Sequence, residues 1–287
     1  MAYDAFYWRD EIHRYKEDYK KWCESGRKII KRYRDERKDA TNIDIRFNIL
    51  WSNIKTLKPA VYSRAPNIEV SRRFKDQNDV GRVASMILER TIDYELRQYS
   101  DFHSALSNAI DDRLLPGRGV SWLRYEPKIE TQEQPEITDD VENEGREVGE
   151  GEAYGMAGEV EPFEVVADER TPVDYVFWED FAHLPARTWE EVTWVARRVY
   201  MSKDEGIERF GDIFENVPLT YSREKDPQND DNNQNVVPED KKAVVWEIWC
   251  KSSKKVYWIS NGYDELLDER DDPLELESFF PCPKPLF

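Results

Sequence analysis

Apolar residues recur every three or four positions along the first 115 residues, which predicts amphipathic helices. The most regular stripe opens the chain, with charged residues at almost every position between its members. This stripe consists of Trp8, Ile12, Tyr15, Tyr19, Trp22, Gly26, Ile29 and Tyr33. It predicts a helix over residues 7–38, either a coiled-coil strand or a long helix laid across the protein body or a neighbouring subunit. The second interpretation is favoured because the stripe is aromatic rather than rich in Leu and Ile.

A second predicted helix, over residues 44–63, is apolar on more than one side. One stripe consists of Phe47, Leu50, Ile54, Leu57 and Val61, and a second set of Ile45, Ile49 and Trp51. A helix of this kind is expected to be surrounded by protein, so we expect it at the centre of the fold. Pro59 lacks the amide hydrogen of a helical residue, which predicts a kink or a restart there. Beyond Pro66, the alternation of Ile68 and Val70 predicts a short strand.

Two further helices are predicted over residues 79–99 and 101–115. The apolar positions of the first are Val80, Val83, Ile87, Leu88, Thr91 and Tyr94, and those of the second are Phe102, Ala105, Leu106, Ala109, Ile110 and Leu114. The turn Pro116-Gly117-Arg118-Gly119 ends the second of them. Its glycines suggest a phosphate loop, but the turn follows a helix and precedes a strand. Phosphate loops have the reverse order, so a structural turn is favoured.

The second half of the chain alternates with period two, which predicts strands. They cover residues 120–129, 162–167, 173–178, 193–201, 243–250 and 254–259. We expect Val120–Ile129 to pair antiparallel with the strand that ends near Ala167. Between the strands, Ser202 and Glu205 form a capping box that begins a short helix over residues 203–210. The pattern as a whole predicts an α+β fold, with long N-terminal helices packed on a mainly antiparallel β region.

Charge is strongly acidic but unevenly placed. The chain has 60 acidic and 42 basic residues and a net charge of −18. Sixteen of the acids and only three bases lie between Glu126 and Arg170. Affinity for nucleic acid comes mainly from clustered Lys and Arg, so we expect no tight DNA binding by the chain itself. Residues 130–160 are expected to form an acidic excursion at the tip of a hairpin, and they lack the regular spacing of a calcium loop.

Candidate chemistry is sparse. The histidines, His13, His103 and His183, are isolated in sequence, and the neighbours Asp111 and Asp112 point to different faces of a helix. No nucleophile, metalloprotease or nucleotide-binding motif is present, so we expect no enzyme activity, no metal and no cofactor. Three widely spaced cysteines favour a reducing compartment. No apolar run approaches the ~20 residues of a membrane span, which indicates a soluble protein made inside the cell.

Three runs of sequence carry a family resemblance. They are WSNIKTLKPAVYSRAP from Trp51, PGRGVSWLRYEP from Pro116 and DFAHLPARTWEEVTWVARRVYMSKDEGIERFG from Asp180, and WEIWCKSSKKVYWIS and ESFFPCPKPLF continue them. In this order and at these lengths they resemble the portal proteins of short-tailed bacteriophages, over nearly the whole chain from about residue 40. No single run is a chemical motif.

The resemblance implies a subunit of a dodecameric ring at one capsid vertex of the virion, assembled in the host cytoplasm. The implied partners are further copies of the chain, the terminase, head-completion and tail adaptor proteins, and the major capsid and scaffolding proteins. Double-stranded DNA passes through such rings without sequence-specific contacts, during packaging and during ejection. No membrane is involved.

The resemblance also implies a layout. Residues 1–118 match a helical part of the portal wing, 119–260 a β-rich wing part, and 261–287 a proline-rich lead-in toward a stem. Family members continue beyond this point, so the chain is expected to correspond to the N-terminal wing. Candidate residues for packing within the wing, or against neighbouring subunits or other helices, are Trp8, Tyr15, Tyr19, Trp22, Trp51 and Arg64. Two alternatives remain open: a metal-dependent nuclease using carboxylates of the acidic segment, and a helical scaffold or adaptor without a channel.

Overall fold

The computed structural model describes residues 3–36, 47–72, 78–99, 101–132, 163–222 and 241–285. The chain divides into two compact units, one formed by Met1–Arg124 with Pro172–Phe287 and the other by Tyr125–Thr171. The boundary expected after residue 118 lies inside the first unit, which holds both the long helices and the main sheet. Most of the acidic excursion predicted over residues 130–160 lies outside the described residues.

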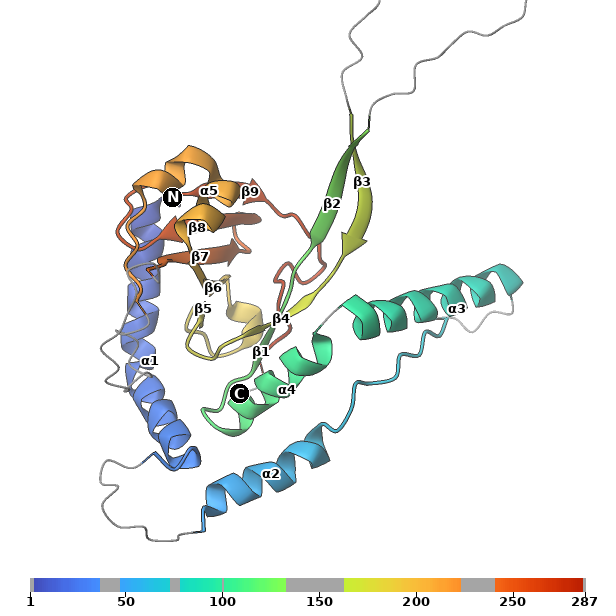
Figure 1. Cartoon of the computed structure of the whole chain (residues 1–287), viewed down its shortest axis with the longest axis horizontal. Coiled ribbons are helices and arrows are strands. Elements are labelled where there is room, and N and C mark those ends of the chain that lie inside the picture. The colour runs from blue at the N-terminus through green and yellow to red at the C-terminus, as the bar shows by residue number, and fades with distance from the viewer. Residues whose placement is uncertain are drawn as a thin grey trace, which may run out of the picture. The chain divides into compact units, whose positions relative to one another are not determined.

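In the part of the chain that the structure describes, five α-helices form, the first four where the three- and four-residue spacing predicts them and the fifth after the capping box (Figure 1). They are α1 (Ala5–Tyr33), α2 (Ile49–Val61), α3 (Asp79–Tyr94), α4 (Phe102–Leu114) and α5 (Lys203–Phe210). A π-helical turn, Glu95–Tyr99, follows α3, and short 3-10 turns cover Trp189–Glu191 and Gly211–Asn216. The capping box of Ser202 and Glu205 at the start of α5 is confirmed.

The first unit also contains two antiparallel sheets. In the smaller, β1 (Val120–Leu123) pairs with β4 (Val173–Val176). The larger has five strands in the order β5 (Phe181–His183), β6 (Trp194–Met201), β7 (Ala243–Cys250), β8 (Lys255–Ser260) and β9 (Asp268–Asp271). Every neighbouring pair in it is antiparallel. The predicted α+β class, with N-terminal helices and an antiparallel sheet, is therefore confirmed.

The second unit is a hairpin. Its strands β2 (Glu126–Gln132) and β3 (Phe163–Arg170) pair antiparallel, with a register shift between Lys128 and Ile129. The prediction of one strand over Val120–Ile129 is wrong in its first half, which belongs to β1 and pairs with β4. The reason is packing, since Val120 and Trp122 are both buried in the core of the first unit. Antiparallel pairing is confirmed only for the second half.

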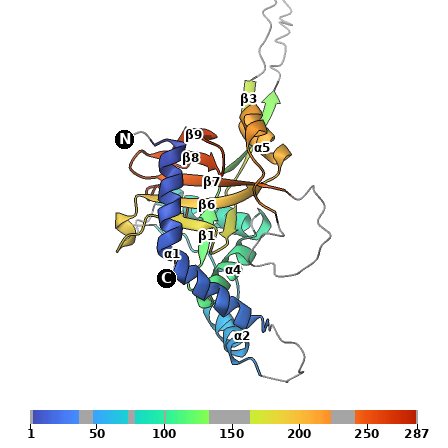
Figure 2. The same cartoon turned by 90° about the vertical axis from the view of Figure 1, so that its left-hand side faces the viewer.

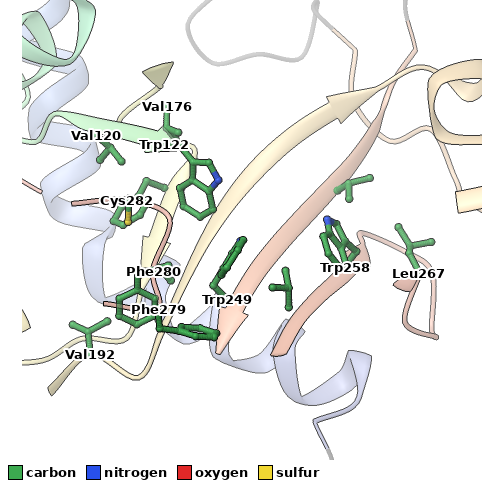
Figure 3. Close-up of a cluster of buried hydrophobic side chains, with 14 of the residues drawn as sticks. Val120, Trp122, Val176, Val192, Trp249, Trp258, Leu267, Phe279, Phe280 and Cys282 are labelled. Carbon is green, nitrogen blue, oxygen red and sulfur yellow. The ribbon is translucent and has the colours of Figure 1, made fainter. Parts of the chain in front are cut away.

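Hydrophobic side chains cover both faces of the five-stranded sheet. Figure 2 shows α1 lying across one face, where Trp8, Ile12 and Tyr15 pack on a cluster that includes Trp194, Trp246, Ile248 and Tyr257. On the other face, drawn in Figure 3, a second cluster includes Trp122, Val176, Trp249, Trp258, Phe279 and Phe280. The prediction of a long helix laid across the protein body is therefore confirmed. We also expected other helices or a neighbouring subunit to cover its aromatic stripe, but the sheet of the same chain covers Trp8 and Tyr15.

The predicted central position of residues 44–63 is also wrong. Ile54 is the one residue buried in α2, and most of its apolar side chains face outward. The helix runs through Pro59 without a restart and ends at Val61. The strand predicted around Ile68 and Val70 does not form. Instead of joining a ladder, the amide of Val70 donates to the carboxylate of Glu89 on α3 (3.2 Å).

Candidate interaction surface

A buried arginine joins α1 to the turn before β1. Arg118 is 1% exposed, and its guanidinium donates to the hydroxyl of Tyr15 (2.7 Å) and to the carbonyl oxygens of Trp178 (2.5 Å) and Phe181 (2.9 Å). It also lies over the ring of Trp22, 4.5 Å from the centroid. Because the guanidinium contacts groups of its own chain, Arg118 stabilises the fold. This agrees with the prediction that the turn containing Gly117 and Gly119 is structural and does not bind phosphate.

The two glycines of this turn are required by geometry. Gly117 has φ of +102°, which favours glycine. A Cβ on Gly119 would lie 1.9 Å from the carbonyl oxygen of Ala109 in α4. The close approach of the turn to α4 thus leaves no room for a side chain, and it places Arg118 under α1.

The neighbouring carboxylates Asp111 and Asp112 have separate partners, as predicted. Asp111 accepts from the ammonium of Lys58 on α2 (2.6 Å). Asp112 is buried, and its Oδ2 accepts from the hydroxyl of Tyr175 and from the amide of Trp178 (3.2 Å). Burial raises the pKa of Asp112 to about 7, against the lowering effect of both hydrogen bonds. The pair ties α4 to α2 and to β4, and it does not form a catalytic dyad.

A cleft of about 490 Å³ lies between the start of α4, the strand β4 and the strand β6. Its two arginines are already paired. Arg197 contacts Asp174 (3.1 Å) and Glu247 (2.7 Å), and Arg198 contacts Asp180 (2.5 Å). The polar lining also includes Asp101, Ser104, Asn108 and Tyr175. With its arginines neutralised by carboxylates, the cleft offers no concentrated charge to a phosphate or to a metal.

The most distinctive surface is apolar and lies on α2 and α3. Twelve of the seventeen large hydrophobic side chains that are exposed among the described residues fall between residues 47 and 94. We call one set the α2 face: Phe47, Ile49, Trp51, Leu57 and Val61. We call the other the α3 face: Val80, Val83, Ile87, Leu88 and Tyr94. Single exposed hydrophobics are normal, but clusters of this size mark interaction sites.

The opposite side of α3 is covered by the chain's own extended segment. The side chain of Arg72 lies where a Cβ on Gly81 would be, and its Nη1 donates to the carbonyl oxygen of Asn78 (2.9 Å). The carboxylate of Glu89 accepts from the amide of Val70. None of the described residues of α3 is buried. Its polar and small side therefore faces its own chain, while its apolar side faces outward.

The structure places the six candidate packing residues in two groups. Trp8 and Tyr15 are buried on the sheet, and Tyr19 and Trp22 are half-buried beside Arg118, so these four lie together within the chain. Trp51 and Arg64 are exposed and lie apart from them. The α3 face was missed as a surface because a helical stripe predicts burial without saying what covers it. Nothing in the pattern singled out Arg118 or Asp112 as buried.

Other chemistry is equally limited in the part of the chain that the structure describes. No group of three or more His, Cys, Asp or Glu side chains is placed to hold a metal ion among the described residues. Cys23, Cys250 and Cys282 are free thiols. Within the same ranges, no helix has the length and apolar character needed to cross a membrane.

No protein-family model and no curated protein matches the chain. Evidence for its function therefore comes from its own residues and from the resemblance of its sequence runs.

Proposed function

We propose that the chain is a structural subunit of a ring-shaped portal, the head-to-tail connector at the unique capsid vertex of a short-tailed bacteriophage. In this role it packs against identical copies and has no catalytic task. The ring is the conduit for double-stranded DNA during packaging and ejection. It is also the platform on which the terminase and the head-completion and tail proteins dock.

One observation carries the proposal: a closed, well-packed core is combined with two large apolar helix faces that its own described residues leave uncovered. A subunit of a ring needs two different surfaces, because it presents one to the neighbour before it and another to the neighbour after it. The α2 face and the α3 face supply two such surfaces on a single chain. A protein that works as a monomer has no need of them.

The resemblance to portal proteins falls on structured parts of the chain. The run from Trp51 covers α2 and the extended segment after it, and the run from Pro116 covers the Arg118 turn and β1. The run from Asp180 covers β5, β6 and α5. The runs that resemble portal proteins therefore coincide with residues that form the fold and the α2 face. This coincidence supports the proposal that the chain has the architecture of a portal wing.

The charge of the chain fits a conduit for DNA. A net charge of −18 repels phosphate, so duplex DNA slides past such a protein without being held. We expect no nanomolar binding of duplex DNA at physiological salt. The partners that follow from this role are further copies of the chain, the terminase, the head-completion or tail adaptor protein, and the capsid and scaffolding proteins.

Native mass spectrometry of the purified protein tests the proposal. We expect one dominant mass at a whole multiple of the 34.1 kDa chain, consistent with a closed ring and unchanged over a range of protein concentrations. A monomer, or a ladder of open-ended polymers, contradicts a ring. Cleavage of DNA that depends on a divalent cation and stops with a chelator would instead support the nuclease alternative.

A further inference from the structure

The α2 face and the α3 face differ in charge. Residues 47–64, which include α2, contain the cations Lys55, Lys58 and Arg64 and no acid; Lys58 is paired with Asp111 of its own chain, so Lys55 and Arg64 leave a charge of +2. Residues 79–99, which include α3, contain four acids and three bases; without Glu89, which faces its own chain, their charges balance. Two α2 faces brought together repel each other, whereas an α2 face against an α3 face meets acids as well as bases.

The two helices also match in size and in anchor residues. At about 1.5 Å per residue, the 13 residues of α2 and the 16 of α3 are about 20 and 24 Å long. Each face has an exposed Trp or Tyr, Trp51 on the α2 face and Tyr94 on the α3 face, and these residue types dominate protein interfaces. Isolated helices of this length are marginal in water, so α3, with no buried residue of its own, gains most from being covered.

We propose that the α2 face of one copy packs against the α3 face of the next copy. A single heterologous contact of this kind covers both faces of every copy in a ring. Symmetric pairing needs two separate contacts, one of which sets the +2 of one α2 face against the +2 of another. That these contacts close into a ring rests on the proposed function. The contact between the α2 face and the α3 face requires only a second copy of the chain.

Both helices stay in contact with their own chain in this arrangement. Ile54 is buried and Lys58 holds α2 to Asp111 of α4, and Glu89 holds the extended segment to α3. The exposed apolar side chains of α2 flank Ile54 and Lys58, whereas those of α3 lie opposite Glu89. Both sets are presented by anchored helices, so packing on a neighbour does not require the fold to open.

Site-directed cross-linking of the full chain tests the contact. Leu57→Cys lies on the α2 face and Ile87→Cys on the α3 face. A mixture of the two single variants, treated with a short bifunctional thiol reagent, should give a cross-linked dimer, and the double variant should give a ladder of multimers. The unmodified chain controls for Cys23, Cys250 and Cys282. The matched control is Thr56→Cys with Arg82→Cys, at exposed positions of the same helices outside the two faces, and it should give no ladder.

Each outcome is informative. Dimers formed by Leu57→Cys alone or by Ile87→Cys alone would mean symmetric pairing and would overturn the inference. Absence of every cross-link would also overturn it, and would mean that a different protein or another segment of the polypeptide covers these faces. Native mass spectrometry of the same samples separates the two claims. Closed rings without α2–α3 cross-links would support the proposed function and contradict the α2–α3 contact. A ladder of cross-linked multimers without closed rings would support the contact and contradict the proposed function.

A second variant measures the contribution of the face to assembly. Leu57→Asp places a charge in the α2 face, and Thr56→Asp places the same charge one residue away, outside it. Because Leu57 is half-exposed in the single chain, its helical circular dichroism and thermal midpoint should change little. We expect roughly tenfold or greater weakening of assembly by Leu57→Asp and near-normal assembly by Thr56→Asp. Equal effects of the two variants would contradict the inference.

Discussion

The buried carboxyl of Asp112 makes a prediction about the pH dependence of stability. Burial raises its pKa from 3.8 in the unfolded chain to about 7 in the fold. The folded protein therefore binds this proton more tightly than the unfolded protein does. The resulting stabilisation is fully present below about pH 4 and is lost as the pH rises through 7. At about 1.4 kcal/mol for each unit of pKa, the loss amounts to about 4 kcal/mol in the free energy of unfolding.

His183 acts in the opposite direction over part of this range. Burial lowers its pKa from 6.5 to about 4, so the folded protein binds this proton less tightly than the unfolded protein. The stabilisation from neutral His183 is present above pH 6.5 and is lost as the pH falls through 4, by roughly 3 kcal/mol. From these two groups alone, the wild-type protein should show little net change between pH 4 and 6.5.

Asp112→Asn separates the two groups. An asparagine keeps an oxygen that accepts from Tyr175 and Trp178 but does not titrate. We expect the free energy of unfolding of this variant to rise by roughly 3 kcal/mol from pH 4 to 6.5, as His183 alone predicts. The stability of the variant relative to wild type should increase by about 4 kcal/mol between pH 4 and 8. Urea unfolding, followed by tryptophan fluorescence at several pH values, measures both quantities.

The control is the neighbouring carboxylate. Asp111→Asn removes a partly exposed ion pair with Lys58 and should leave the pH profile close to that of wild type. Tyr175→Phe removes a hydrogen bond that favours the ionised carboxylate, so it should raise the pKa of Asp112 further and extend the loss of stability to higher pH. A constant difference between Asp112→Asn and wild type across the whole range would refute the reasoning.

Four further substitutions test the packing. Trp8→Ala should cost about 3–5 kcal/mol of stability, because the ring is fully buried against Trp194 and Tyr257; a thermal midpoint close to wild type would mean that α1 does not lie on the sheet. The double variant Trp8→Ala with Trp22→Ala should lose stability of the fold before it loses assembly. Native rings of this double variant with an unchanged thermal midpoint would contradict this expectation. Gly119→Ala should lower the urea midpoint because its Cβ meets the carbonyl oxygen of Ala109, and an unchanged midpoint would show that the turn can move away from α4. Arg118→Met should destabilise by about 2 kcal/mol or more through the unpaired carbonyl oxygens of Trp178 and Phe181; an equally stable variant would mean that water replaces the guanidinium.

Local patterns in the sequence were enough to predict most of the elements. The helices form where hydrophobic spacing and polar caps agree, as at Asn48, whose side chain accepts from the amide of Trp51 (3.0 Å). The hairpin of β7 and β8 follows from two aromatic strands joined by a short turn. These features depend on residues close in sequence, which is why the pattern predicts them.

The errors concern what each element packs against. The apolar residues on two sides of α2 suggested that this helix lies buried at the centre of the fold. In the single chain most of them are exposed. The pattern of apolar residues does not say whether the same chain or another chain covers them. The strands β5 and β9 were missed because Phe181–His183 is short and Asp268–Asp271 is entirely charged. Their pairing comes from neighbouring strands rather than from their own side chains. The buried Arg118 and Asp112 depend on partners 60 or more residues away.

Electron microscopy of the purified, assembled protein tests the central claim most directly. The account predicts closed rings of identical subunits with an axial opening wide enough for duplex DNA, and with α2 of each subunit against α3 of the next. Single subunits, filaments that do not close, or compact particles without an opening would contradict it.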